Sequence, residues 1–162
     1  QQGLIYSALV DGRYVLKFVG DVRLTLCATL DSHLESILSD STVHEVLVDL
    51  TETQAIDSTS LGLIAKLSIR SQYNGLPKPA LVSTQEDITR ILYTMGFDHL
   101  FLLLESLPDN VEDLQQLPVV QESVDEMRHR IIASHRILMD LNDTNRDAFK
   151  DLVDTLESIQ EK

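Results

Sequence analysis

Short apolar segments alternate with segments of helical periodicity along residues 4–104, and this alternation constrains the fold more than any other feature of the chain. Strands are expected at Leu4–Val10, Tyr14–Val19, Val43–Leu50, Pro79–Ser83 and Phe101–Leu104. Asp11-Gly12 is a hairpin signal between the first two strands, and Gly20-Asp21 is expected to end the second one.

Three segments between these strands carry apolar residues at the three-and-four spacing of a helix. They cover residues 24–38, the stretch from Ile56 to the Asn74-Gly75 stop, and residues 88–95, which Gly96 closes. Strands that alternate with helices favour parallel pairing. The sequence therefore predicts an α/β fold with a mostly parallel four- to five-stranded sheet flanked by helices.

The composition changes after residue 104. Pro108 and Pro118 lie near the ends of a segment with an acidic middle. Two helices then follow, because two sets of residues repeat every seven positions: Val124, Ile131 and Leu138, and Val120, Met127, Ser134 and Leu141. Asn142-Asp143 interrupts them, Thr144 with Asp147 resembles a capping box, and Phe149, Leu152, Leu156 and Ile159 resume the spacing.

We therefore divide the chain into a domain at residues 1–104, a linker at 105–118 and an antiparallel helical hairpin at 119–162. The apolar seam of the hairpin either closes the hairpin or docks on the domain, or else it meets a partner. The pattern alone leaves both alternatives open.

Charge and cysteine content exclude several classes of function. The formal net charge is -13, so nucleic acid and an anionic membrane surface are unfavourable partners. No apolar run is long enough to span a bilayer. Cys27 is the only cysteine, which rules out an intrachain disulfide, fits a cytoplasmic protein and indicates a small buried apolar side chain. The five histidines are scattered without ligand spacing, so no metal or cofactor is expected.

The segment VHEVLVDLTETQAIDSTSLGLIAKL, residues 43–67, resembles the signature of the STAS domain, a family named for sulphate transporters and anti-sigma-factor antagonists. Its matching parts are Asp49-Leu50-Thr51 and the run Asp57-Ser58-Thr59-Ser60-Leu61-Gly62, in which Ser60 replaces a common glycine. The resemblance extends to Gly20, Gly75 and MGFDHLF at 95–101, and covers about residues 4–104. The two C-terminal helices resemble extensions of some proteobacterial antagonists linked to two-component systems.

This resemblance implies a partner-binding protein with a phosphorylation switch. The unphosphorylated form would bind an anti-sigma factor or serine kinase, and a PP2C-type phosphatase, in some systems carried on a response regulator, would reset it. The phosphoacceptor would be Ser58, with Thr59 as the alternate. The implied partner-binding residues are Asp21, Asp57, Ser58, Thr59, Ser60 and Leu61. The resemblance implies nothing about the oligomeric state.

A serine at the start of a helix is expected on exposed loop backbone, where a kinase can reach it. Helix N–H groups and the helix dipole tolerate a phosphate there. The phosphate adds about -1.5 to -2 charge units next to Asp57. A partner surface fitted to a neutral Ser58 would then face an unpaired dianion.

Three other interpretations compete with the switch. Asp57 and Ser58 can serve only as a helix cap. The chain can be a non-switching STAS scaffold in a signalling or lipid-transport complex. A hydrolase is disfavoured, because the segment around Ser58 lacks the glycines of G-x-S-x-G, no histidine has a sequence reason to reach it, and no glycine-rich phosphate-binding motif occurs. The sequence thus predicts a binding module that is not an enzyme.

Overall fold

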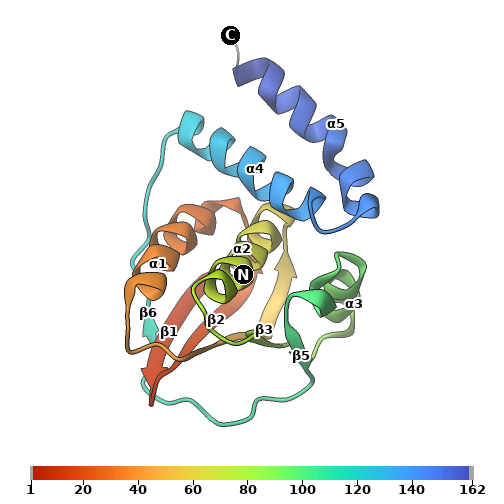
Figure 1. Ribbon diagram of the computed structural model, residues 1–162. Helices are drawn as coiled ribbons and strands as arrows, with labels where there is room; N and C mark the ends of the chain where they lie inside the picture. The colour runs from red at the N-terminus through yellow and green to blue at the C-terminus, as the bar shows by residue number, and fades with distance from the viewer. Residues whose placement is uncertain (1, 161–162) are drawn as a thin grey trace.

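A mixed six-stranded sheet forms the base of the computed structural model, which describes residues 2–160 (Figure 1). Its strand order is β5-β4-β3-β2-β1-β6. The strands are β1 (Leu4–Val10), β2 (Arg13–Val22), β3 (Glu45–Ile56), β4 (Ala80–Val82), β5 (Leu102–Leu104) and β6 (Gln115–Gln116). Strands β2 to β5 pair in parallel, whereas β1 is antiparallel to both of its neighbours, β2 and β6. The predicted fold class is confirmed, and β6 is a short addition that the sequence did not indicate.

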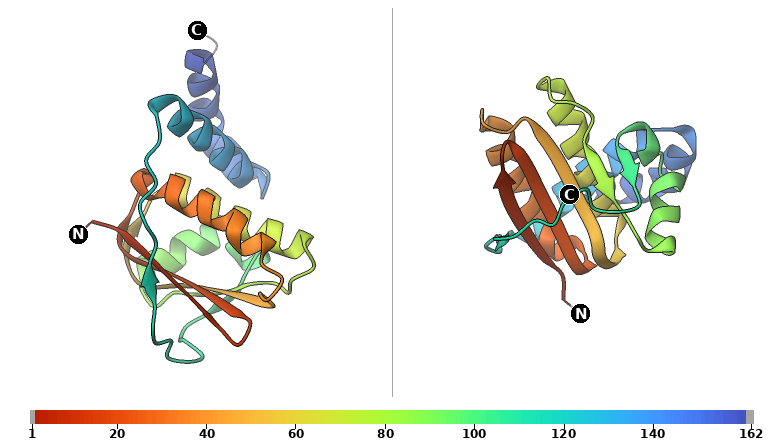
Figure 2. Two further views of the ribbon diagram at one scale, coloured as in Figure 1. Left: turned by 90° about the vertical axis from the view of Figure 1, so that its left-hand side faces the viewer. Right: turned by 90° about the horizontal axis from the view of Figure 1, so that it is seen from below.

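Helices α1 (Cys27–Ser39), α2 (Ser58–Tyr73) and α3 (Glu86–Thr94) cover one face of this sheet (Figure 2). Short 3-10 helices, η1 (Leu24–Leu26) and η2 (Phe97–His99), lie before α1 and after α3. Alternate residues of the strands point to this face, and Leu16, Phe18 and Val48 are fully buried there. The helices therefore share one aliphatic core with the sheet.

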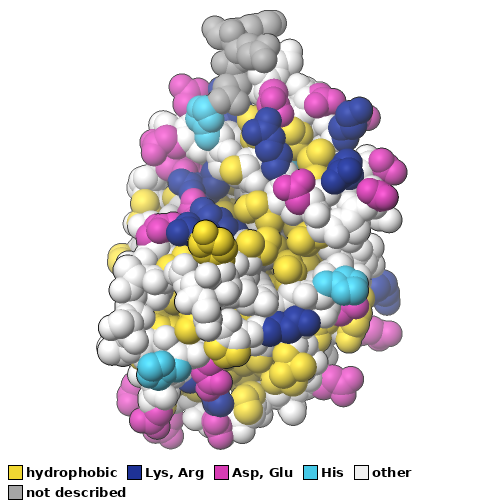
Figure 3. Space-filling model, viewed as in Figure 1, with side chains coloured by type: hydrophobic (Ala, Val, Ile, Leu, Met, Phe, Trp, Pro, Cys, Tyr) yellow, Lys and Arg dark blue, Asp and Glu magenta, His cyan; other side chains and the backbone are white. Residues whose placement is uncertain are grey.

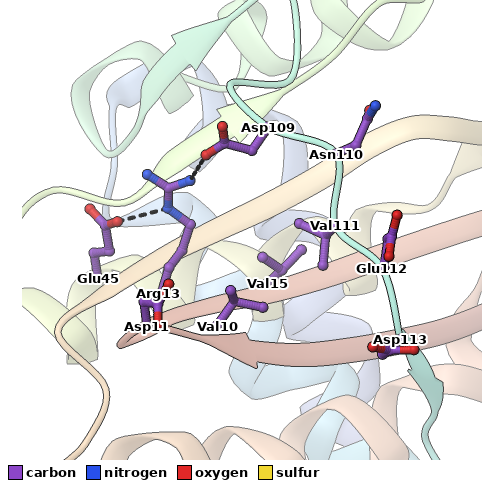
Figure 4. Close-up of a pocket in the computed structure, with 10 residues that line it drawn as sticks. All are labelled: Val10, Asp11, Arg13, Val15, Glu45, Asp109, Asn110, Val111, Glu112 and Asp113. Carbon is purple, nitrogen blue, oxygen red and sulfur yellow. Dashed lines mark hydrogen bonds and ion pairs between the residues drawn. The ribbon is translucent and has the colours of Figure 1, made fainter.

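The segment after β5 crosses the opposite face of the sheet. Leu107, Val111 and Leu114 pack against a small buried cluster of Val15, Leu47 and Val82. Arg13 fixes the start of the crossing, because its guanidinium donates to Glu45 at 2.7 Å and to Asp109 at 2.8 Å (Figure 4). An open pocket of about 600 Å³ lies beside these ion pairs. Residues 105–114 thus pack on the domain as a strap.

Strands β2 and β3 run further than the sequence indicated. The prediction that Gly20-Asp21 ends β2 was wrong, because the strand continues to Val22. Gly20 has φ +81°, and the register shifts between Gly20 and Asp21 because β3 carries one extra residue there, so β2 passes this irregularity without ending. The two strands therefore end together, just before Asp57.

Two C-terminal helices, α4 (Val124–Met139) and α5 (Asp143–Gln160), form a third layer, with α4 above α1 and α2 (Figures 1 and 2). A capping box starts α4, since Ser123 Oγ accepts from the Glu126 amide and Glu126 accepts from the Ser123 amide. The predicted capping box of Thr144 and Asp147 was wrong, because Thr144 lies inside α5. Asn142 caps that helix, and its Oδ1 accepts from the Asn145 amide at 2.8 Å.

The buried face of α4 differs in part from the predicted seam. Ser134 and Leu138 are fully buried, but Val124 is 72% exposed. Ile132 and His135 are buried although neither belongs to the seam. The difference arises because α4 packs against both α2 and α5, so its buried face is wider than that of a simple pair. Over the two helices, apolar side chains show between charged side chains of both signs (Figure 3).

Within residues 2–160, we find no helix that is long and apolar enough to cross a membrane.

Candidate functional site

The candidate site lies where β3 ends and α2 begins. Asp57 is the N-cap of α2, and its Oδ1 accepts from the Ser60 amide at 2.8 Å. Its Oδ2 accepts from the Leu24 amide at 2.7 Å, and its own amide donates to Val22 O at 3.0 Å. The carboxylate thus ties the start of α2 to η1, and the backbone amide ties it to the end of β2. The predicted capping role of this aspartate is confirmed.

The residues after Asp57 differ sharply in their exposure. Ser58 is partly buried, whereas Thr59, Ser60 and Leu61 are only 6%, 1% and 2% exposed. The Ser60 hydroxyl lies 3.5 Å from Cys27 Sγ in the interior. Of the three consecutive hydroxyl residues, Ser58 alone keeps appreciable accessible surface.

Asp21 and Asp49 complete the set of polar residues that the sequence singled out. Asp21 lies near the end of β2, where it pairs with Ala55 of β3, so it stands at the same edge of the sheet as Ser58. Asp49 is buried within β3, and its Oδ1 accepts from the Thr51 amide at 2.8 Å. Asp49 therefore shapes the strand, while Asp21 lies near the surface of the site.

Helix α4 brings His135 onto Ser58, with 2.7 Å between Nε2 and the serine Oγ. His135 Nδ1 lies 2.8 Å from Ile131 O. A carbonyl only accepts, so Nδ1 carries the proton, and in a neutral ring Nε2 accepts from the Ser58 hydroxyl. The ring is 2% exposed and meets the Phe149 ring edge-on at 4.9 Å.

The next turn of α2 makes the closest approach to α4. Ser134 Oγ donates to Thr59 O. A Cβ added at Gly62 would lie only 1.9 Å from Ser134 Oγ and 2.4 Å from Ser134 O. The glycine of the Leu61-Gly62 pair is therefore the residue that lets the two helices touch.

A group of charged side chains extends this contact to α1. Asp31 of α1 accepts from Lys66 of α2 at 2.7 Å and forms an ion pair with Arg130 of α4. Arg130 also contacts Glu122 at 2.9 Å, just before α4 begins. The Glu122 side chain is 5% exposed, and its Oε1 is buried without a hydrogen-bond partner in the described part of the chain. The hairpin is thus held on α1 as well as on α2.

One expectation about Ser58 was wrong. Its hydroxyl does not lie on open loop backbone, because α4 covers it and brings a histidine onto it. The sequence carries no signal for this pair, since residues 58 and 135 meet only through the docking of α4. The nearest indication in the sequence is that His135 adjoins Ser134, which belongs to the predicted apolar seam.

A serine hydroxyl that donates to a histidine can lose its proton to that ring, as in nucleophilic catalysis. Here the histidine is buried, so a substrate cannot approach the pair while α4 is docked. The Ser60 amide, which could stabilise an anion at the helix start, is already bonded to Asp57. The arrangement therefore fits a covered hydroxyl better than an open catalytic site. Across residues 2–160, no group of three or more His, Cys, Asp or Glu is placed to hold a metal ion.

Cys27 is buried as predicted, with 1% of its surface exposed. Burial raises the pKa of its thiol to about 12, against a weaker opposite effect of its hydrogen bond with Ser60. The thiol therefore stays protonated and behaves as a small apolar side chain.

The STAS domain family matches residues 8–114, well over half of the chain. Solved structures of the same fold include an anti-sigma factor antagonist from Mycobacterium paratuberculosis, with 20% identity, a TM-score of 0.55, and coverage of 65% of this chain and 88% of that one. A putative anti-sigma factor antagonist from Thermotoga maritima has 20% identity, a TM-score of 0.56, and coverage of 62% and 86%.

The unphosphorylated form of the anti-sigma factor antagonist SpoIIAA is also similar, with 8% identity, a TM-score of 0.51, and coverage of 64% of this chain and 89% of that one. No curated protein matches the chain. At these identities, the solved structures establish the shared fold alone. The family match ends at residue 114, before α4 and α5 begin.

Proposed function

Because the chain belongs to the STAS domain family, we propose that it is an anti-sigma-factor antagonist that is switched by phosphorylation of Ser58. The observation that carries this proposal is the position of Ser58. It follows the capping Asp57 at the start of α2, and it alone among three consecutive hydroxyl residues is not buried. Thr59 is a weaker candidate for the acceptor, because it is 6% exposed.

The proposed cycle has two states. In the unphosphorylated state the protein binds an anti-sigma factor or a serine kinase through the surface around Asp21, Asp57 and Ser58. The kinase transfers the terminal phosphoryl group of ATP to Ser58 Oγ, with release of ADP and of the hydroxyl proton. The new charge beside Asp57 then ends the complex, because a partner fitted to the neutral serine would bury an unpaired dianion.

A PP2C-type phosphatase, carried on a response regulator or separate, would restore the neutral serine. Because these partners regulate transcription, we place the protein in the cytoplasm with them. The protein itself acts by binding, and the buried position of His135 supports this non-enzymatic role.

A second candidate function is a STAS scaffold without a switch, in a signalling or lipid-transport complex. The hydrogen bond between Ser58 and His135 favours this alternative, since it gives the serine a structural task in holding α4. The two candidates differ in whether a bound kinase modifies Ser58.

The test incubates the protein with candidate serine kinases and ATP, and locates phosphate by peptide mass spectrometry. Three proteins are compared: wild type, Ser58→Ala and Thr59→Ala. We expect phosphate at Ser58 in wild type and Thr59→Ala, and none in Ser58→Ala. Phosphate on Thr59 alone would move the acceptor by one residue. A kinase that binds the protein and modifies neither residue would leave the scaffold as the function.

A further inference from the structure

Helix α4 lies on the same surface of α2 that the proposed function assigns to a partner. It contacts Ser58 through His135 and the Thr59 carbonyl through Ser134. It also crosses Gly62 at van der Waals contact, as the position of a hypothetical Cβ there shows. A second protein cannot reach these atoms while α4 is in place.

We propose that this face of α2 is a helix-binding surface, that α4 occupies it in cis, and that a partner or an enzyme that modifies Ser58 must first displace α4. The inference rests on the proposed function for the identity of Ser58 as the acceptor, but the docking of α4 is independent of it.

The contacts of α4 define what the surface recognises. Gly62 leaves a flat site that accepts a small side chain, which Ser134 provides. Asp31 on the neighbouring α1 accepts a basic side chain, which Arg130 provides four residues earlier. The two positions lie on one face of a helix, one turn apart. A competing partner is therefore expected to present an amphipathic helix with a basic residue one turn before a small one.

The contact of the hairpin with the domain has a polar and an apolar part. The polar part consists of hydroxyl, carbonyl, imidazole and ion-pair contacts, all of which water can replace when the helices separate. The apolar part includes Leu138, which is fully buried in the core, so undocking must expose it. At the far end of α4, Asn142 and Asn145 donate to Met95 O at 3.4 Å and 2.9 Å. The hairpin can leave without breaking a strand of the sheet, because residues 105–117 stay paired and packed on the domain.

Docking of α4 also blocks access to the Ser58 hydroxyl. Its Oγ lies 2.7 Å from His135 Nε2, so the ring occupies the space next to Oγ. A kinase has to place Oγ in line with the phosphate of ATP, which needs that space. The docked hairpin is therefore expected to slow both partner binding and modification.

The test uses Ser58→Cys and follows labelling of the introduced thiol by a maleimide that carries a long polyethylene glycol chain. The bulky reagent stands in for a macromolecule. Ser134→Trp is added to force α4 off Gly62, and Ala133→Trp is the matched control, because the neighbouring Ala133 is exposed on α4. Cys27 is buried and serves as an internal control for an intact domain.

We expect the thiol at position 58 to be labelled at least about tenfold faster in the Ser134→Trp protein than in the Ala133→Trp protein. The labelling rate follows the fraction of molecules in which α4 is undocked. Cys27 should stay unlabelled in both. Equal labelling rates at position 58 in the two proteins would overturn the inference. If Ser134→Trp exposes Cys27, the domain is damaged, and Arg130→Glu replaces it as the displacing variant, since it sets a like charge against Asp31.

A peptide of residues 121–141, cross-linked into a helix on its exposed face, tests recognition in trans. Added in excess to the Ser58→Cys/Ser134→Trp protein, it should slow labelling at position 58, whereas the same peptide with Ser134→Trp should not. Labelling that neither peptide slows would overturn helix recognition by this surface. Because no kinase is needed, these results stand even if Ser58 proves not to be a phosphoacceptor.

Discussion

Asp57 shows at the scale of one residue how the capping and switching interpretations fit together. Its two carboxylate oxygens bind the amides of Ser60 and Leu24, so the aspartate holds the start of α2 in place. The hydroxyl of Ser58, which follows, takes no part in the cap, and in this structure it hydrogen-bonds to His135. A fixed backbone with a hydroxyl that can change partners is what a switch at this position requires.

Cys27 gives a prediction for the dependence of stability on pH. Its thiol has an ordinary pKa of 9.0 that rises to about 12 on folding, mainly through burial. The unfolded chain therefore releases this proton first, so the stabilisation present below pH 9 is lost progressively as the pH rises from about 9 to 12. We expect the free energy of unfolding to fall more steeply above pH 9 in wild type than in Cys27→Ala.

Urea unfolding curves at a series of alkaline pH values measure this difference. The other titrating groups are common to both proteins, so they cancel in the comparison. Parallel pH profiles for wild type and Cys27→Ala would contradict the burial of the thiol.

At the scale of elements, the packing of α2 on α4 depends on the absence of a side chain at Gly62. The sequence motif contains Gly62, but the motif alone does not say what approaches it. The structure places Ser134 there, and the buried face of α4 follows from this crossing rather than from the seven-residue spacing. Periodicity predicted the helix, while its partner helices decided which residues are buried.

Gly62→Ala is expected to loosen the hairpin. The added Cβ would overlap Ser134 Oγ and its carbonyl, so α4 must shift, at a cost of about 1–3 kcal/mol. Hydrogen–deuterium exchange should show faster exchange of the α4 amides, with β2 and β3 unchanged. Ser134→Gly should restore only part of the protection in Gly62→Ala, because the backbone overlap remains. Wild-type exchange of α4 in Gly62→Ala would refute the close contact.

The whole molecule is built in three layers, and the chain crosses the open face of the sheet once on its way to the third layer. After β5 it straps the open face through Val111 and its neighbours, and β6 then leads it up to the helices (Figure 2). The division at 105–118 and 119–162 that the sequence suggested stays a prediction. The strap nevertheless contributes to the packing of the domain.

Val111→Ala tests the strap. Loss of two partly buried methyl groups that pack on Val15, Leu47 and Val82 is expected to lower the free energy of unfolding by about 1 kcal/mol. Asp109→Ala, two residues earlier, removes only a largely exposed ion pair with Arg13 and should change stability by less than about 0.5 kcal/mol. Equal losses in the two variants would argue against apolar packing of the strap.

The sequence by itself determined the order of strands and helices, the parallel sheet and the cap at Asp57. These features depend on local periodicity and on turn and capping preferences, which act over a few residues. It also indicated Ser58 as the candidate acceptor through a local motif. Only the tertiary structure decided that α4 covers Ser58, that His135 hydrogen-bonds to its hydroxyl and that Gly62 faces Ser134. Those contacts join residues more than seventy positions apart, and they depend on how whole helices pack, which no local pattern encodes.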